Sequence, residues 1–136
     1  SHGGSAMVKW SWVILVYCLL SVTPPIAALH HGAAGLFDIT QTVEVTGSVK
    51  RWSFVNPHPI LVVEVIDDNG EKNEWDIYFG PPGASILRNR GYGPNTFRLG
   101  EFLTIRGNPA RAAGVRGIDV FGDAGSVMRP DGTKVP

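Results

Sequence analysis

Cysteine is almost missing from this chain of 136 residues, and the scarcity limits its chemistry. The single cysteine, Cys18, lies in an uncharged and apolar N-terminal stretch. If that stretch is removed, the remaining chain has no disulfide, no thiol nucleophile and no thiolate metal ligand. Any metal chemistry must then use nitrogen and oxygen ligands.

A basic excess is missing as well, because the 12 lysines and arginines balance the 12 aspartates and glutamates. Nucleic-acid binders usually carry a clear positive charge, so we expect no nucleic-acid partner. The charge is unevenly placed: residues 38–76 hold eight acids and three bases, and residues 77–136 hold four acids and eight bases. We predict that strands from the two halves pair and their surface charges alternate. A functional basic face is the alternative.

Catalytic motifs are also lacking. The sequence has no phosphate-binding loop and no helical His-x-x-x-His, and residues 83–87 lack the second glycine of a nucleophile elbow. We therefore predict a non-enzymatic protein. A hydrolase that uses His58 and a carboxylate is the remaining enzymatic hypothesis.

The N-terminal region has the parts of an export signal. Residues 1–6 read as a tag or translation scar, and residues 7–28 contain a positive charge, an apolar centre and small residues before a cleavage point. Pro24 and Pro25 interrupt the apolar run, which favours a cleaved signal peptide over a retained membrane anchor. The sequence thus predicts a periplasmic or secreted protein, with a flexible arm at 29–35 and one domain at 36–136.

The domain has a mainly β pattern. Valines 43, 45 and 49 share one parity and Trp52 and Phe54 the other, which predicts a bulge near Lys50-Arg51. Further strands are predicted at 60–66, around Trp75–Phe79, at 102–106 and at 115–121 with a possible continuation at 127–128. A helix at 84–90, closed by Gly91, lies between the third and fourth strands. This order is that of a small five-stranded oligonucleotide/oligosaccharide-binding (OB-like) barrel with one short helix between strands 3 and 4.

The sequence also resembles a family of small exported bacterial proteins of unknown function. The resemblance implies an exported barrel and brings no established reaction. It is carried by His30-His31, residues 37–38 with 42–49, Asn56-Pro57-His58, residues 74–77, Gly80-Pro81-Pro82-Gly83, residues 87–91, Leu99-Gly100-Glu101 and residues 104–111.

Histidine is rare, and its placement indicates a metal site. After export the chain keeps imidazole only at His30, His31 and His58, and imidazole is the commonest protein ligand for transition metals. Cleavage before Leu29 would let the amine, two amides and His31 form a square-planar site suited to Cu(II) or Ni(II). Cleavage before His30 would let its amine and ring bind copper together with a second imidazole. The alternatives are a solvated tail for the pair and a turn-capping role for His58.

A second set of candidates could bind an envelope ligand or a partner protein without metal. Tyr78 has the polar parity of its strand and could stack on a ligand, and Arg106, Arg111 and Arg116 flank a glycine-rich loop. For most aromatic residues we predict core packing instead. Glu64, within an apolar strand, is expected to pair with an arginine from the second half, and Asp67-Asp68 are expected in a solvated hairpin turn.

Overall fold

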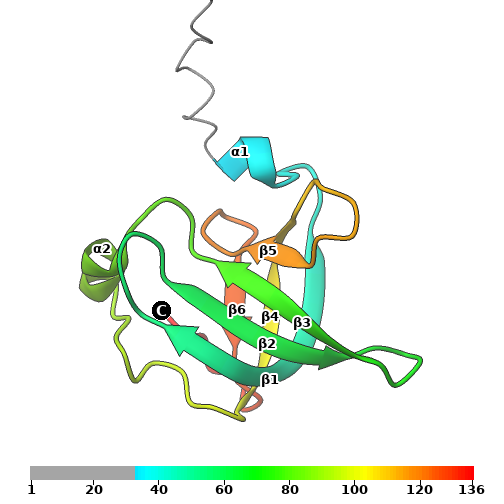
Figure 1. Cartoon of the computed structure of the whole chain (residues 1–136). Coiled ribbons are helices and arrows are strands. Elements are labelled where there is room, and N and C mark those ends of the chain that lie inside the picture. Colours follow the sequence, from blue (N-terminus) through cyan, green and yellow to red (C-terminus); the bar gives the residue numbers. More distant parts are fainter. Residues whose placement is uncertain (1–32) are drawn as a thin grey trace, which may run out of the picture.

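The computed structural model describes residues 33–136, which form a closed β-barrel with two short helices (Figure 1). The barrel order is β1-β2-β3-β5-β4, closed by pairing of β4 with β1, and β6 pairs with Thr104–Arg106 of β4 on the edge opposite β1. Among the strands of residues 33–136, only β3 and β5 pair in parallel. The elements are α1 (Ala33–Leu36), β1 (Val43–Ser53), β2 (Ile60–Ile66), β3 (Lys72–Tyr78), α2 (Ala84–Asn89), β4 (Phe102–Pro109), β5 (Gly117–Asp119) and β6 (Ser126–Met128).

This arrangement confirms the predicted fold, a mainly β, five-stranded barrel with one short helix between strands 3 and 4. Some strand limits differ. The fourth strand runs on to Pro109, whereas the fifth has only three residues. The segment at 126–128 is a separate strand, because it pairs with β4 and not with β3.

Strand β1 is long because it pairs with two different strands and so closes the barrel. Its first half pairs with β4 and its second half with β2, and the register shifts between Val49 and Arg51. This shift is the predicted bulge. Before it, residues of one parity face the core, and after it Trp52 and Phe54 do. At Gly47 the strand lies so close to the Glu64 carbonyl of β2 that a Cβ would overlap it.

The core fills the barrel interior with alternate residues of each strand. Val49, Leu61, Ile77, Ile105 and Ile118 are at most 1% exposed. Trp52, Phe54 and Trp75 pack around this cluster and Phe79 is part of it, which confirms the core role predicted for them.

Helix α2 ends with a Schellman motif. The N–H of Gly91 donates to the Arg88 carbonyl and that of Tyr92 to the Leu87 carbonyl, with Gly91 at φ +95°. The predicted glycine cap is therefore confirmed, and it brings Tyr92 back over Leu87 into the core.

The charged residues meet partly as predicted. Glu44 in the acidic half lies opposite Arg106 in the basic half across the β1–β4 ladder. The prediction that Glu64 pairs with an arginine is wrong. The Glu64 carboxylate pairs with Lys50 at 3.3 Å and with Lys72 at 3.5 Å. Since Glu64 points outward, lysines on the two flanking strands reach it directly, and an arginine from the second half is not needed.

The hairpin between β2 and β3 confirms the predicted solvated turn. The Asp67 carboxylate accepts the N–H groups of Asn69 and Glu71, both at 2.9 Å, and Asp68 is exposed. These bonds fold the turn and leave no pair of carboxylates positioned for catalysis there.

The close approach at Gly47 gives a stability prediction. Gly47→Ala should lower the free energy of unfolding by about 1–3 kcal/mol, because the methyl group meets a backbone carbonyl that can move only with β2. Gly93→Ala is the control, since a Cβ there meets nothing within 4 Å. Urea denaturation checks both; equal effects of the two substitutions would contradict the role of Gly47.

Candidate functional site

His58 lies in the loop between β1 and β2, between two anchored residues. Asn56 Oδ1 accepts the N–H of Ala84 at 3.0 Å, and Pro59 is fully buried. The imidazole itself is exposed, and among residues 33–136 it has no hydrogen bond or ion pair. The predicted alternative, in which His58 bonds the backbone of a turn, is therefore not found in the described part of the chain.

The capping role belongs to Asn56. Helix α2 begins after Gly83, which has no side chain to bond the first N–H groups, and Asn56 supplies the acceptor from another loop. A Cβ at Gly83 would lie 2.6 Å from Asn56 Oδ1, so glycine allows the two loops to touch. Two motifs that are distant in sequence, Asn56-Pro57-His58 and Gly80-Pro81-Pro82-Gly83, thus form one corner of the structure.

The other two predicted metal ligands, His30 and His31, lie outside the described residues. Within residues 33–136, no three His, Cys, Asp or Glu side chains lie close enough together to hold a metal ion. A metal site of three such side chains that includes His58 would therefore need a ligand from outside residues 33–136. Helix α1 begins at Ala33, so the end of the predicted arm at 29–35 is helical.

Tyr78 and two of the three predicted arginines lie in neighbouring segments. Tyr78 packs against Phe37 with the rings tilted by 59° and their centroids 5.3 Å apart, and a Cβ at Gly117 would touch both rings. The exposed Arg116 precedes Gly117, and its carbonyl accepts the N–H of Asp76 on β3. Burial raises the pKa of Tyr78, and the charge of Asp76 adds to this effect, so the phenol is neutral at physiological pH.

The other two arginines are more constrained. Arg111 lies 4.0 Å from the Asp38 carboxylate, and its backbone N–H donates to Leu36. Arg106 is on β4, with Glu44 on one side and Ser126 on the other. The three arginines therefore do not form a single anion site: Arg111 and Arg116 flank the loop beside Tyr78, and Arg106 belongs to a strand surface.

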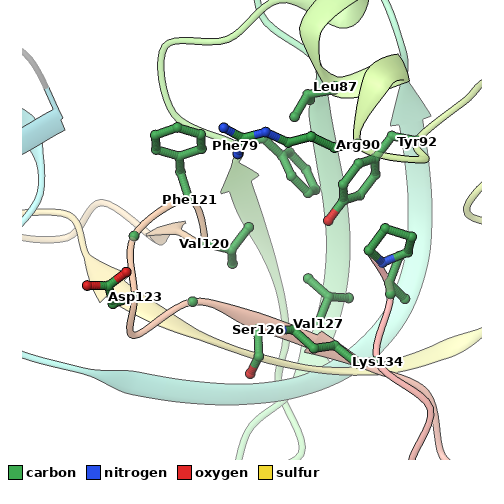
Figure 2. Close-up of a pocket in the computed structure, with 14 residues that line it drawn as sticks. Phe79, Leu87, Arg90, Tyr92, Val120, Phe121, Asp123, Ser126, Val127 and Lys134 are labelled. Carbon is green, nitrogen blue, oxygen red and sulfur yellow. The ribbon is translucent and has the colours of Figure 1, made fainter.

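A cavity of about 340 Å³ lies beside the C-terminal end of α2 (Figure 2). Buried apolar side chains form its floor, and exposed charged residues lie around its opening. In Figure 2 the Tyr92 hydroxyl points into the space between Arg90, Val120 and Val127.

The cavity was not predicted from the sequence: of its lining residues, Phe79 was expected in the core and none was expected to bind a ligand there. The lining residues come from four separate segments, namely the residue just after β3, α2 with the loop after it, the β5–β6 loop with β6, and the last residues of the chain, so no local motif unites them. The position of one cavity residue, Tyr92, could have been predicted from the sequence. With Gly91 as a helix-terminating glycine, the next residue is expected to contact the last helical turn, which places Tyr92 on Leu87.

The fold and the described residues define a small OB-like barrel with an exposed histidine corner and a cavity at α2. A family model described as a family of unknown function (DUF6152) matches residues 18–119, so the chain belongs to that family. No curated protein and no solved structure matches the chain. In the part of the chain that the structure describes, no helix is long and apolar enough to cross a membrane.

The corner formed by Asn56 can be tested by stability. Asn56→Ala should lower the free energy of unfolding by about 0.5–2 kcal/mol, the usual effect of losing a helix-capping acceptor. Asn95→Ala, at an exposed position, is the matched control and should change it by less than about 0.5 kcal/mol. Chemical denaturation measures both, and no difference between the variants would show that the cap does not hold α2.

Replacing Asp119 or Asp38 by asparagine should change the pH dependence of stability in opposite directions. Burial raises the pKa of Asp119, although hydrogen bonds from the N–H groups of Phe121 and Gly80 oppose the shift. The stability that the protonated carboxyl contributes is therefore lost as the pH rises through the pKa of the folded state. Relative to wild type, Asp119→Asn should therefore gain stability between about pH 3 and about pH 7. Urea titrations at several pH values within this range measure the effect.

Asp38→Asn is the comparison for that experiment. The Thr40 hydroxyl and N–H lower the pKa of Asp38, with a further contribution from Arg111, so its stabilisation is present above the unfolded pKa and lost in acid. This variant should lose stability relative to wild type over the same rise in pH. The same trend for both variants would contradict the assignment.

Proposed function

We propose that the protein is an exported, non-enzymatic binding protein that holds copper or a similar transition-metal ion through His30, His31 and His58. The observation that carries the proposal is the state of His58. Its imidazole is exposed and lacks a partner among residues 33–136, while the residues on both sides are anchored. A ligand held in this way loses little conformational freedom when it binds a metal.

Chain length is consistent with a shared site. Phe37, six residues after His31, packs on Tyr78, and Tyr78 pairs with Ile60, two residues after His58. Residues 33–36 of this segment form α1, and a helix rises only about 1.5 Å per residue, so the segment spans well under the roughly 20 Å of six extended residues. The N-terminal segment therefore enters the barrel near the strand ends that carry the His58 loop, which supports a site made from both.

Export also remains part of the proposal. It rests on the signal-peptide pattern of residues 7–28, and a periplasmic or secreted location would place the chain where a cysteine-free nitrogen site can encounter copper. The cleavage point decides which nitrogen atoms are available. Mass spectrometry of the protein recovered from the producing cell would identify the first residue of the exported form.

Binding of an envelope ligand or partner protein through the barrel face, without metal, is the second candidate. The observation that favours it is that Tyr78, Arg116 and Arg111 lie around one short strand, β5, and the loop before it. This candidate predicts that Arg111→Gln with Arg116→Gln abolishes capture of an envelope component, whereas the histidine substitutions leave it unchanged.

Copper titration tests the first candidate. The mature form should bind Cu(II), and substitution of all three histidines by alanine should weaken binding by at least about a hundredfold, because every imidazole ligand is lost. His58→Ala alone separates a shared site from a purely N-terminal one. It should reduce the rise in melting temperature that Cu(II) causes, since metal contact with the folded barrel stabilises the native state.

The outcomes are distinct. If His58→Ala leaves both the affinity and the copper-dependent melting shift unchanged, the barrel contributes no ligand. If the triple variant binds Cu(II) as tightly as the wild type, the histidine site as a whole is wrong. Ser85→Ala, at an exposed position on α2, serves as the control for nonspecific effects of substitution near this corner.

A further inference from the structure

We propose that the cavity beside α2 binds a small molecule with an apolar, ring-sized body and a carboxylate group. This site is separate from the histidines and would operate without metal. Its volume, about 340 Å³, is at the lower end of the range for small-molecule pockets. A peptide strand or a nucleic acid would need a longer groove.

The floor of the cavity accounts for the apolar body. Phe79, Leu87, Val127 and Val135 are each at most 3% exposed, and their side chains belong to the barrel core. A floor made of core residues is held in place by the packing beneath it. It therefore offers a preformed apolar surface that a ring can cover without rearrangement of the fold.

The opening of the cavity accounts for the carboxylate. Arg90 and Lys134 line it, and neither pairs with a carboxylate within residues 33–136. Arg90 lies over the Phe121 ring, 4.8 Å from its centroid, which fixes the guanidinium above the cavity. Asp123 is the one acid in the lining, and in Figure 2 its carboxylate points away from the Tyr92 hydroxyl. Among the lining side chains, the two cations Arg90 and Lys134 therefore outnumber the one acid.

Tyr92 adds a hydrogen-bond donor inside the cavity. Its side chain is 9% exposed, and among the described residues its hydroxyl has no hydrogen-bond partner. Burial raises its pKa, with the charge of Arg90 acting in the opposite direction, so the phenol keeps its proton and can donate. Among the described residues no buried polar side-chain atom lacks a hydrogen-bond partner, so this unpartnered hydroxyl is open to the cavity, where it can donate to water or to a ligand. A carboxylate held by Arg90 would lie within its reach.

A binding experiment with 2-naphthoate tests the proposal. Titration of the metal-free protein, in the presence of a chelator, should shift the amide NMR signals of residues 90–92, 120–127 and 135. The neutral analogue 2-naphthamide should bind at least about tenfold more weakly, because it cannot form the charge-assisted bond to Arg90. Shifts confined to other regions, or equal affinities for the two compounds, would overturn the proposal.

Two arginines of the same helix region provide a matched pair of variants. Arg90→Gln should weaken 2-naphthoate binding by about tenfold or more, whereas Arg88→Gln should change it by less than about twofold. Arg88 is also exposed and lies over an aromatic ring, that of Phe54, but it does not line the cavity. Equal affinities of the two variants would contradict the role of Arg90.

Tyr92→Phe distinguishes ligand contact from structural support. The free energy of unfolding should stay within about 0.5 kcal/mol of wild type, since the hydroxyl has no partner among the described residues to lose. The affinity for 2-naphthoate should fall by about two- to tenfold, the usual effect of one neutral hydrogen bond. If this variant binds 2-naphthoate as tightly as wild type does, the Tyr92 hydroxyl does not contact the ligand.

Discussion

Closure of the barrel by β1 is the constraint on which the rest of the structure depends. This single strand of eleven residues must pair with β4 along its first half and with β2 along its second. Such a strand has to bend, and it does so where Gly47 lies against the β2 backbone and where the register shifts after Val49. The shift also changes which parity faces inward. Valines therefore fill the middle of the barrel, and Trp52 and Phe54 reach the end beneath α2.

That end is organised by aromatic contacts. Trp52 meets Phe97 with centroids 4.8 Å apart and donates its indole N–H to the Gly93 carbonyl at 2.8 Å. Phe79 and Tyr92 pack edge to face beside them. The rings fill the space under the loop after α2, while the smaller side chains of the β5–β6 region leave room on the other side of Tyr92. The cavity thus arises where an aromatic layer meets residues too small to extend it.

The sequence predicted the features that depend on local pattern. Alternation predicted the strands and the bulge, the helix-terminating glycine predicted the end of α2, and the element order predicted the barrel. The features that were not predicted correctly, or not predicted at all, depend on contacts between residues that are distant in the sequence. Glu64 pairs with lysines because strand register places them beside it. The contact between Asn56 and Ala84 joins two loops that only the closed sheet brings together. The cavity combines four separate segments, and no periodicity in one segment can indicate it.

Helix α2 connects the two candidate sites, although they differ in how they relate to the family. Its first N–H is held by the loop that carries His58, and its last residues lead to Arg90 at the cavity. All three histidines lie within the segment that matches the family, residues 18–119. Much of the cavity wall lies beyond it, from Val120 to Pro136. A function carried by the histidines would therefore use only the part of the chain that defines the family. A ligand in the cavity would depend also on the segment that follows, so the two proposed functions would rely on different parts of the chain.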